Sequence, residues 1–108
     1  MKPTNSKYGS TKVKYGGRTY DSKLEATYAQ NFEWQKKAGE IKEIIPQYKL
    51  ELRVCGVLIC NYFVDFKIVY ADDTVKYVEI KGFETALWKI KWKMAQAIYG
   101  KENFVLKR

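Results

Sequence analysis

Three ionisable side chains stand in two segments whose composition is otherwise typical of β-strands. Glu79 and Lys81 lie two residues apart in segment 77–82 (YVEIKG), so on a strand both project from the same face. Asp65 lies in segment 64–66 (VDF), between an aliphatic and an aromatic residue. Charges in such surroundings are costly unless they are paired, hydrogen-bonded or bound to a metal. The three residues therefore indicate either a reactive site or a structural ion pair.

The turn between the two segments decides whether the carboxylates meet. Residues 71–74 (ADDT) carry a turn signal, so strands 57–70 and 75–81 are expected to form an antiparallel hairpin. A loop of odd length, for instance one centred on Asp72, or a β-bulge places Asp65 and Glu79 on one face of the sheet. An even two-residue loop places them on opposite faces. The site hypothesis requires the first arrangement.

Two adjacent carboxylates without histidine suit one kind of chemistry. Asp65 and Glu79 would repel each other, and a hard divalent cation such as Mg²⁺ relieves this because it prefers oxygen ligands and keeps several waters. The backbone carbonyl of Ile80 lies between the site residues and can add another oxygen. Lys81 can orient or deprotonate a water and neutralise charge at a reacting phosphate, and Glu25 can hold that water or assist a second metal. These parts fit phosphodiester hydrolysis.

Composition excludes several other chemistries. The chain has no histidine, which rules out Ser-His-Asp and Cys-His nucleophiles and His-based nucleases. Cys55 and Cys60 are the only cysteines, match no zinc pattern and are expected to be buried, reduced thiols. No apolar run approaches the roughly 20 residues that span a bilayer, so no membrane partner is expected. The protein is expected in the cytoplasm.

A net charge of +8 makes a polyanion the first partner to consider, with nucleic acid ahead of a membrane surface. Residues 1–20 hold five basic residues, no acidic residue and several glycines, and are expected to form a basic flexible arm or loose hairpin. This arm either contacts phosphates or is only a solvated tail. The expected DNA contacts are Lys12, Lys14, Arg18, Lys89, Lys91 and Lys93.

Residues 21–108 are expected to form one folded domain. Segment 21–38 has a helical apolar stripe and ends before Gly39. Its Glu25 has capping-box spacing from Ser22, so this carboxylate either caps the helix or points into the site. Alternation of apolar and polar residues from Gln47 to Val54 predicts a first strand, with Pro46 at its entry.

Segment 84–99 is expected to be a second helix, before a short strand over 103–106. Leu87, Ile90, Met94 and Ile98 form its expected core stripe. The order is helix, three-stranded antiparallel meander, helix and short final strand, which predicts one α/β (α+β) domain of two or three layers.

The acidic and basic residues resemble those of a known enzyme group. Glu25 on a first helix, Asp65 on a strand and Glu79-Ile80-Lys81 on the next strand resemble the PD-(D/E)xK nuclease superfamily, whose restriction-endonuclease-like core has this order of elements. Segments 15–25 (YGGRTYDSKLE), 64–66 and 79–82 look like a family of small bacteriophage nuclease-like proteins within it. The layout is also similar to the phage junction-resolving enzyme of the endonuclease I type and to archaeal Holliday junction resolvases.

The resemblance implies roles for single residues. Asp65 and Glu79 become metal ligands, Lys81 the catalytic lysine and Glu25 the helix-borne acid, with Mg²⁺ as cofactor and Mn²⁺ able to replace it. One departure is that Val64, not proline, precedes Asp65. The expected function is then a phage endonuclease selective for branched or Holliday junction DNA, in the cytoplasm of an infected bacterium.

The resemblance also implies a homodimer, because two strands must be cut symmetrically. The aromatic surplus, which includes Trp34, Trp88 and Trp92, can supply its interface or simply pack in the core. Two other functions stay open: a nicking or duplex endonuclease of phage DNA processing, and a non-catalytic DNA-binding module on the same fold.

Overall fold

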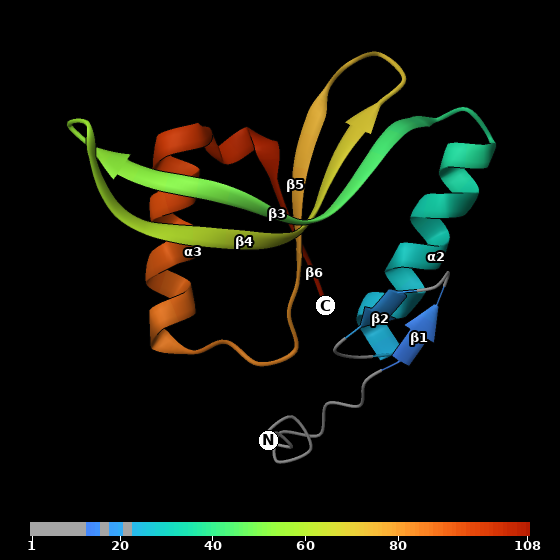
Figure 1. Cartoon of the computed structure of the whole chain (residues 1–108), viewed down its shortest axis with the longest axis horizontal. Coiled ribbons are helices and arrows are strands. Elements are labelled where there is room, and N and C mark those ends of the chain that lie inside the picture. The colour runs from blue at the N-terminus through green and yellow to red at the C-terminus, as the bar shows by residue number, and fades with distance from the viewer. Residues whose placement is uncertain (1–12, 16–17, 21–22) are drawn as a thin grey trace.

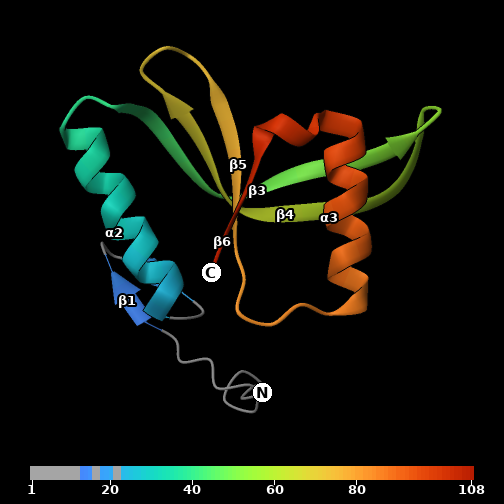
Figure 2. The same ribbon diagram turned by 180° about the vertical axis from the view of Figure 1, so that it is seen from behind.

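A mixed four-stranded sheet lies between two helices (Figures 1 and 2). The computed structural model describes residues 13–15, 18–20 and 23–108, with side chains from residue 23 onward. Its elements are β1 (Val13–Tyr15), β2 (Arg18–Tyr20), α2 (Lys23–Lys37), β3 (Ile41–Val54), β4 (Val57–Tyr70), β5 (Val75–Ile80), α3 (Ala86–Tyr99), the 3₁₀ helix η1 (Lys101–Asn103) and β6 (Phe104–Lys107).

The predicted fold class is confirmed. The sheet has the order β3-β4-β5-β6, in which β3, β4 and β5 form an antiparallel meander and β6 pairs parallel to β5. The α3 helix provides the crossover that a parallel pair requires. The two helices lie on opposite sides of β5 and β6, so the centre of the molecule has three layers (Figure 1).

Only part of the predicted arm lies among the described residues. β1 and β2 pair antiparallel, with Val13 opposite Tyr20, and this small hairpin lies beside α2 (Figure 1). The expected flexibility of the arm, the DNA contact at Lys12 and the capping residue Ser22 fall outside the described residues.

The β3–β4 hairpin is longer than the alternating pattern indicated. β3 begins at Ile41 rather than near Gln47, and the hairpin closes through Cys55 and Gly56, at φ 50° and 81°. Two consecutive positive φ angles are typical of the type I′ turn, whose twist matches that of the flanking strands. Pro46 lies within β3 opposite Phe66, where a residue without an N–H is tolerated because β3 is an edge strand.

Two hydrophobic clusters lie on opposite faces of β5. Val78 and Ile80 pack with Phe66 and with Ala29 and Phe32 of α2. The second cluster joins the outer half of the β3–β4 hairpin to α3, and its buried members are Leu50, Leu52, Tyr62, Val64, Trp88, Ala95 and Phe104. The separation of the two clusters gives each helix its own core.

The predicted core stripe of the second helix is wrong. Leu87, Ile90 and Ile98 are 62, 60 and 38 % exposed, and only Met94 of the predicted stripe packs against the second cluster, in which Trp88 and Ala95 are buried. The buried residues have the same helical spacing as the predicted stripe, and apolar side chains occupy most of the circumference of α3, so periodicity could not select the face. The Trp88 ring buries more area than an aliphatic side chain and therefore decides the orientation.

We predict that Leu52→Ala lowers the free energy of unfolding by about 2–5 kcal/mol, because Leu52 is fully buried and the smaller side chain leaves a cavity. Leu58→Ala is the matched control on the same hairpin, since Leu58 is 42 % exposed, and it should cost less than about 1 kcal/mol. Urea denaturation measures both values. Equal losses in the two variants would contradict the burial of the hairpin against α3.

Candidate active site

The register of β4 and β5 brings Asp65 and Glu79 together. The last pair before the turn is Val69 opposite Val75, so residues 70–74 form a connection of odd length centred on Asp72. The Asp72 Oδ1 atom accepts hydrogen bonds from the N–H and hydroxyl of Thr74, at 3.1 and 2.6 Å, which fixes this turn. The arrangement that the site hypothesis requires is therefore present.

Asp65 extends the β4–β5 pairing with its side chain. Backbone pairing ends at Phe66 opposite Val78, one position before Asp65 would face Glu79. Beyond it, the Asp65 Oδ2 atom accepts a hydrogen bond of 2.8 Å from the backbone N–H of Ile80. Gln47 of β3 contributes a longer contact, 3.4 Å from its Nε2 to Asp65 Oδ1. The Asp65 carboxylate is thus held at the point where β4 separates from β5.

Glu79 is buried in a hydrogen-bonded chain that reaches α3. Its side chain is among the few buried charged groups, at 5 % exposure. The Tyr62 hydroxyl donates to Glu79 Oε1 at 2.7 Å, and the Trp88 indole N–H donates to the Tyr62 oxygen at 3.0 Å. Trp88 also stacks on Trp92, with ring centroids 5.4 Å apart. The chain fixes one oxygen of Glu79 and ties α3 to the acidic pair.

Lys81 is the cation nearest to this pair. Its Nζ lies 3.8 Å from Glu79 Oε2 and 5.1 Å from the centre of the Trp88 ring, which gives the ammonium group a cation–π contact. The backbone N–H of Lys81 donates to the carbonyl of Lys107 at 2.9 Å, so β6 holds this residue in place. One ammonium group therefore faces two carboxylates.

Burial raises the pKa values of both carboxyl groups. Burial is the main cause at Glu79, and the neighbouring Asp65 charge adds to it, raising the pKa of Glu79 to about 8. Burial also raises the pKa of Asp65, although the Ile80 N–H and the Lys81 charge oppose the rise. The Tyr62 pKa is raised as well, chiefly by burial and then by the Glu79 charge, so this hydroxyl stays a hydrogen-bond donor. Near neutral pH the acidic pair holds a proton.

The donor set fits a hard divalent cation. Two carboxylates that share a proton and face one ammonium group offer oxygen ligands that a cation of charge +2 can bind in place of that proton. Among residues 23–108, no three His, Cys, Asp or Glu side chains gather closely enough to hold a metal. A cation here would therefore rely on Asp65 and Glu79, with waters and the predicted Ile80 carbonyl completing its shell.

Glu25 does not join the two carboxylates to make such a group. It is buried near the start of α2, at 8 % exposure, and its charge is not among the causes that shift the pKa of Asp65 or Glu79. The next residue along α2, Ala26, packs with Val78 and Ile80, on the face of β5 opposite Tyr77. The structure thus brings together Asp65, Glu79 and Lys81, and the role of Glu25 stays a prediction.

Sequence reasoning missed Tyr62, Trp88 and Gln47. Tyr62 has the opposite parity to Asp65, so a flat strand would place its side chain on the other face; the β3–β4 hairpin turns away from β5 near Asp65 and brings Tyr62 to Glu79 (Figure 1). Trp88 was missed because the predicted core stripe of the second helix did not include it. Of the three residues, only Gln47 had a feature in the sequence that could have indicated it: it is a polar residue directly after Pro46.

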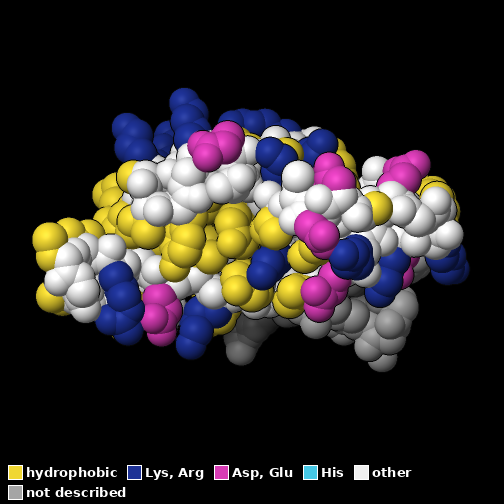
Figure 3. All heavy atoms as spheres, turned by 90° about the horizontal axis from the view of Figure 1, so that it is seen from above, with side chains coloured by type: hydrophobic (Ala, Val, Ile, Leu, Met, Phe, Trp, Pro, Cys, Tyr) yellow, Lys and Arg dark blue, Asp and Glu magenta, His cyan; other side chains and the backbone are white. Residues whose placement is uncertain are grey.

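The predicted DNA-contacting lysines of α3 do not form a single row. Lys89 and Lys93 are exposed, lie one helical turn apart and line a groove beside Leu106 of β6. Lys91 is half-buried and points to another side of the helix. Lys14 lies in β1 and Arg18 in β2. Figure 3 shows Lys and Arg along the edges of one face, around a band of hydrophobic atoms.

We predict that Glu79→Gln reduces the loss of stability between about pH 4.5 and 8. The native carboxyl group keeps a proton that the unfolded chain releases from about pH 4.5 upward, so the free energy of unfolding falls as pH rises toward about 8. One such proton contributes at most about 1.4 kcal/mol per pH unit. Urea denaturation across this range measures the slope.

Glu102→Gln provides the control, because Glu102 is an exposed acid on η1. This variant should keep the slope of the wild-type protein, whereas Glu79→Gln should lose the contribution of about one proton. An unchanged slope in Glu79→Gln would show that Glu79 is ionised throughout the range and would contradict the protonated acidic pair.

Comparison with known proteins gives a family but no activity. No helix among residues 23–108 is long and apolar enough to cross a membrane. No curated protein and no solved structure matches the chain. A family model described as "Protein of unknown function (DUF1064)" matches residues 5–107, almost the whole sequence. The chain therefore belongs to the DUF1064 family.

Proposed function

We propose that the protein is a Mg²⁺-dependent DNA endonuclease that hydrolyses phosphodiester bonds. The observation that carries the proposal is the pair of half-buried Asp65 and buried Glu79, with the Lys81 Nζ 3.8 Å from Glu79. A basic chain with net charge +8 brings such a group to a polyanion. The resemblance of Asp65 and Glu79-Ile80-Lys81 to PD-(D/E)xK nucleases supports the same reaction.

Each residue of the site has a defined task. Asp65 and Glu79 would hold the cation, and Tyr62 would keep Glu79 in one orientation through its 2.7 Å hydrogen bond. A bound Mg²⁺ supplies positive charge at the phosphate and lowers the pKa of a coordinated water. Lys81 adds a second positive charge beside the carboxylates, and its ammonium group can donate to a phosphate oxygen.

Branched DNA, including Holliday junctions, is the proposed substrate. The exposed side of α3 is largely apolar and does not offer the polar side chains with which a recognition helix reads bases in the major groove. Lysine contacts to phosphates would position the protein without reading sequence. Nicking or duplex cleavage is the alternative specificity, and a non-catalytic DNA-binding module is the alternative function, in which protonated Glu79 only completes the core.

We propose that two copies associate through the exposed stripe of α3. This stripe consists of Leu87, Ile90 and Ile98, all among the exposed large apolar side chains. A symmetric pair buries each residue twice and leaves one acidic pair per protomer for each DNA strand. Of the tryptophans suggested for this role, Trp88 and Trp92 pack in the second cluster, whereas Trp34 is 56 % exposed on α2.

We predict that the wild-type protein nicks or cleaves branched DNA with Mg²⁺ and that Asp65→Asn and Lys81→Met each lower the rate at least about a hundredfold, because each removes charge at the reacting phosphate. Gel analysis of a labelled four-way junction, a nicked duplex and an intact duplex measures rate and specificity. EDTA should abolish cleavage in every case.

Asp73→Asn and Lys101→Met are the matched controls, since both residues are exposed and lie outside the site. Both should cleave at the wild-type rate. Cleavage that survives in Asp65→Asn and Lys81→Met would assign the activity to a contaminant. Junction binding without cleavage by the wild-type protein would contradict the nuclease proposal and support the DNA-binding module.

We predict that Ile90→Asp converts a dimer into a monomer. The wild-type protein should have twice the 12.7 kDa chain mass by light scattering after size exclusion, and the variant should have the single mass, because a symmetric interface would bury the new carboxylate twice. Ile59→Asp is the control, since Ile59 is 52 % exposed on the β3–β4 hairpin. A wild-type monomer, or dissociation by Ile59→Asp alone, would contradict the α3 interface.

A further inference from the structure

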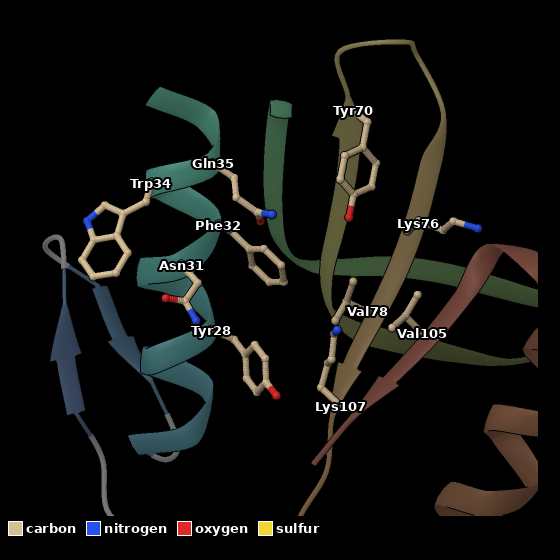
Figure 4. A pocket seen from close by; sticks show the side chains of 10 residues that line it. All are labelled: Tyr28, Asn31, Phe32, Trp34, Gln35, Tyr70, Lys76, Val78, Val105 and Lys107. Carbon is tan, nitrogen blue, oxygen red and sulfur yellow. The ribbon is translucent and has the colours of Figure 1, made fainter. Parts of the chain in front are cut away.

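A cavity of about 580 Å³ lies between α2 and the sheet, on the α2 face of β5 (Figure 4). Its volume is within the range of roughly 300–1,000 Å³ that small-molecule sites occupy. The residues that line it come from α2, from the end of β4 and from β5 and β6: Tyr28, Asn31, Phe32, Trp34, Gln35, Tyr70, Lys76, Val78, Val105 and Lys107.

The cavity has an apolar floor and aromatic walls. Val78 and Phe32 are buried at its base. Figure 4 shows Tyr28 extending from α2 toward the sheet, with its hydroxyl on the side of Lys107, and Tyr70 on β4 with its hydroxyl directed toward Val78. Phenol rings beside an apolar floor suit a flat, unsaturated ring.

Charge makes the cavity selective for an anion. Lys107 and Lys76 line it, and no carboxylate of residues 23–108 does. The Lys107 Nζ lies 5.9 Å from the centre of the Tyr28 ring, so one cation stands beside the aromatic wall. The Lys76 Nζ donates to the carbonyl of Glu102 at 2.6 Å and points away from α2 in Figure 4, so Lys107 is the cation that the cavity offers to a ligand. The amide of Gln35 can both donate and accept hydrogen bonds there.

We propose that this cavity binds one unpaired nucleotide of a DNA strand. A planar base would stack against the Tyr28 ring, its edge would meet the Gln35 amide, and its phosphate would pair with Lys107. A paired base cannot enter, because the base has to leave its stack before it can reach the cavity. The inference depends on the proposed function in that DNA is taken as the ligand, and it adds a source of preference for branched or gapped substrates.

The cavity is separate from the acidic pair. Val78 faces the cavity, whereas the next residue, Glu79, binds Tyr62 in the α3 cluster, on the other face of β5. Binding here therefore requires neither the carboxylates nor a metal. Binding and cleavage can be measured independently.

The test is a titration of the ¹⁵N-labelled Asp65→Asn protein in EDTA, followed by amide chemical shifts. A short oligodeoxythymidylate should shift the signals of Tyr28, Gln35 and Lys107, and a blunt duplex at equal nucleotide concentration should leave them in place. Tyr28→Leu and Lys107→Met should each weaken oligonucleotide binding at least about fivefold, since base stacking and a phosphate contact are lost.

Lys101→Met is the charge-matched control, because Lys101 is exposed on η1 outside the cavity, and it should change affinity by less than about twofold. Two results would overturn the inference: shifts that avoid the cavity, or unchanged affinity in Lys107→Met, which removes charge with little effect on the core. Cavity binding in a protein that cleaves nothing would leave this inference standing and refute the nuclease. Cleavage without chemical shift changes at the cavity would refute this inference and leave the nuclease proposal standing.

Discussion

The rest of the site depends on two carboxylates forced together at the end of a strand pair. Asp65 would be the next residue to pair with β5, but its side chain takes the Ile80 N–H, which places its carboxylate beside Glu79. Burial prevents solvent from separating the two charges, so the pair keeps a proton or requires a cation. A purely structural pair of opposite charges would not need this arrangement, since one carboxylate would satisfy Lys81.

The scaffold supports this costly contact from both sides. The five-residue turn fixes the register, and the Trp88–Tyr62–Glu79 chain makes α3 part of the site. β6 holds the backbone of Lys81 by pairing parallel to β5. The α2 helix packs on the other face of β5, where it forms a cavity of different chemistry. One strand thus carries an acidic site on one face and an aromatic, basic cavity on the other.

The local patterns of the sequence were sufficient for the order of elements from α2 to β6. Alternation marks β4 and β5, and the Asp72 turn has a recognisable signal, but an odd and an even loop both fitted it, so the meeting of Asp65 and Glu79 was decided only by the pairing of Val69 with Val75. The exposed and buried sides of α3 could not be predicted, because Leu87 and Trp88 belong to apolar stripes of equal periodicity. The choice between them comes from the tertiary contact of Trp88 with Tyr62.

The contact between Tyr62 and Glu79 could not be predicted from the sequence either. A period of two assumes a flat strand, whereas the β3–β4 hairpin turns away from β5 and rotates its inner face toward α3. For Glu25, the sequence suggested a contact that the structure does not show. Its place on the first helix fits the resemblance to PD-(D/E)xK nucleases, yet no three acidic side chains of residues 23–108 gather as metal ligands. An order of residues along the chain indicates a family pattern and does not fix the distances within it.

Binding of a divalent cation to the acidic pair distinguishes a metal site from a structural pair. Paramagnetic Mn²⁺, added in small amounts to the ¹⁵N-labelled protein, broadens the amide signals of residues close to the bound ion. We expect selective broadening around Asp65 and Ile80 that is lost in Asp65→Asn. The broadening should strengthen as pH rises toward about 8, because Glu79 gives up its proton there. Broadening that is absent, or equal in Asp65→Asn, would show that the two carboxylates are a structural pair and not a metal site.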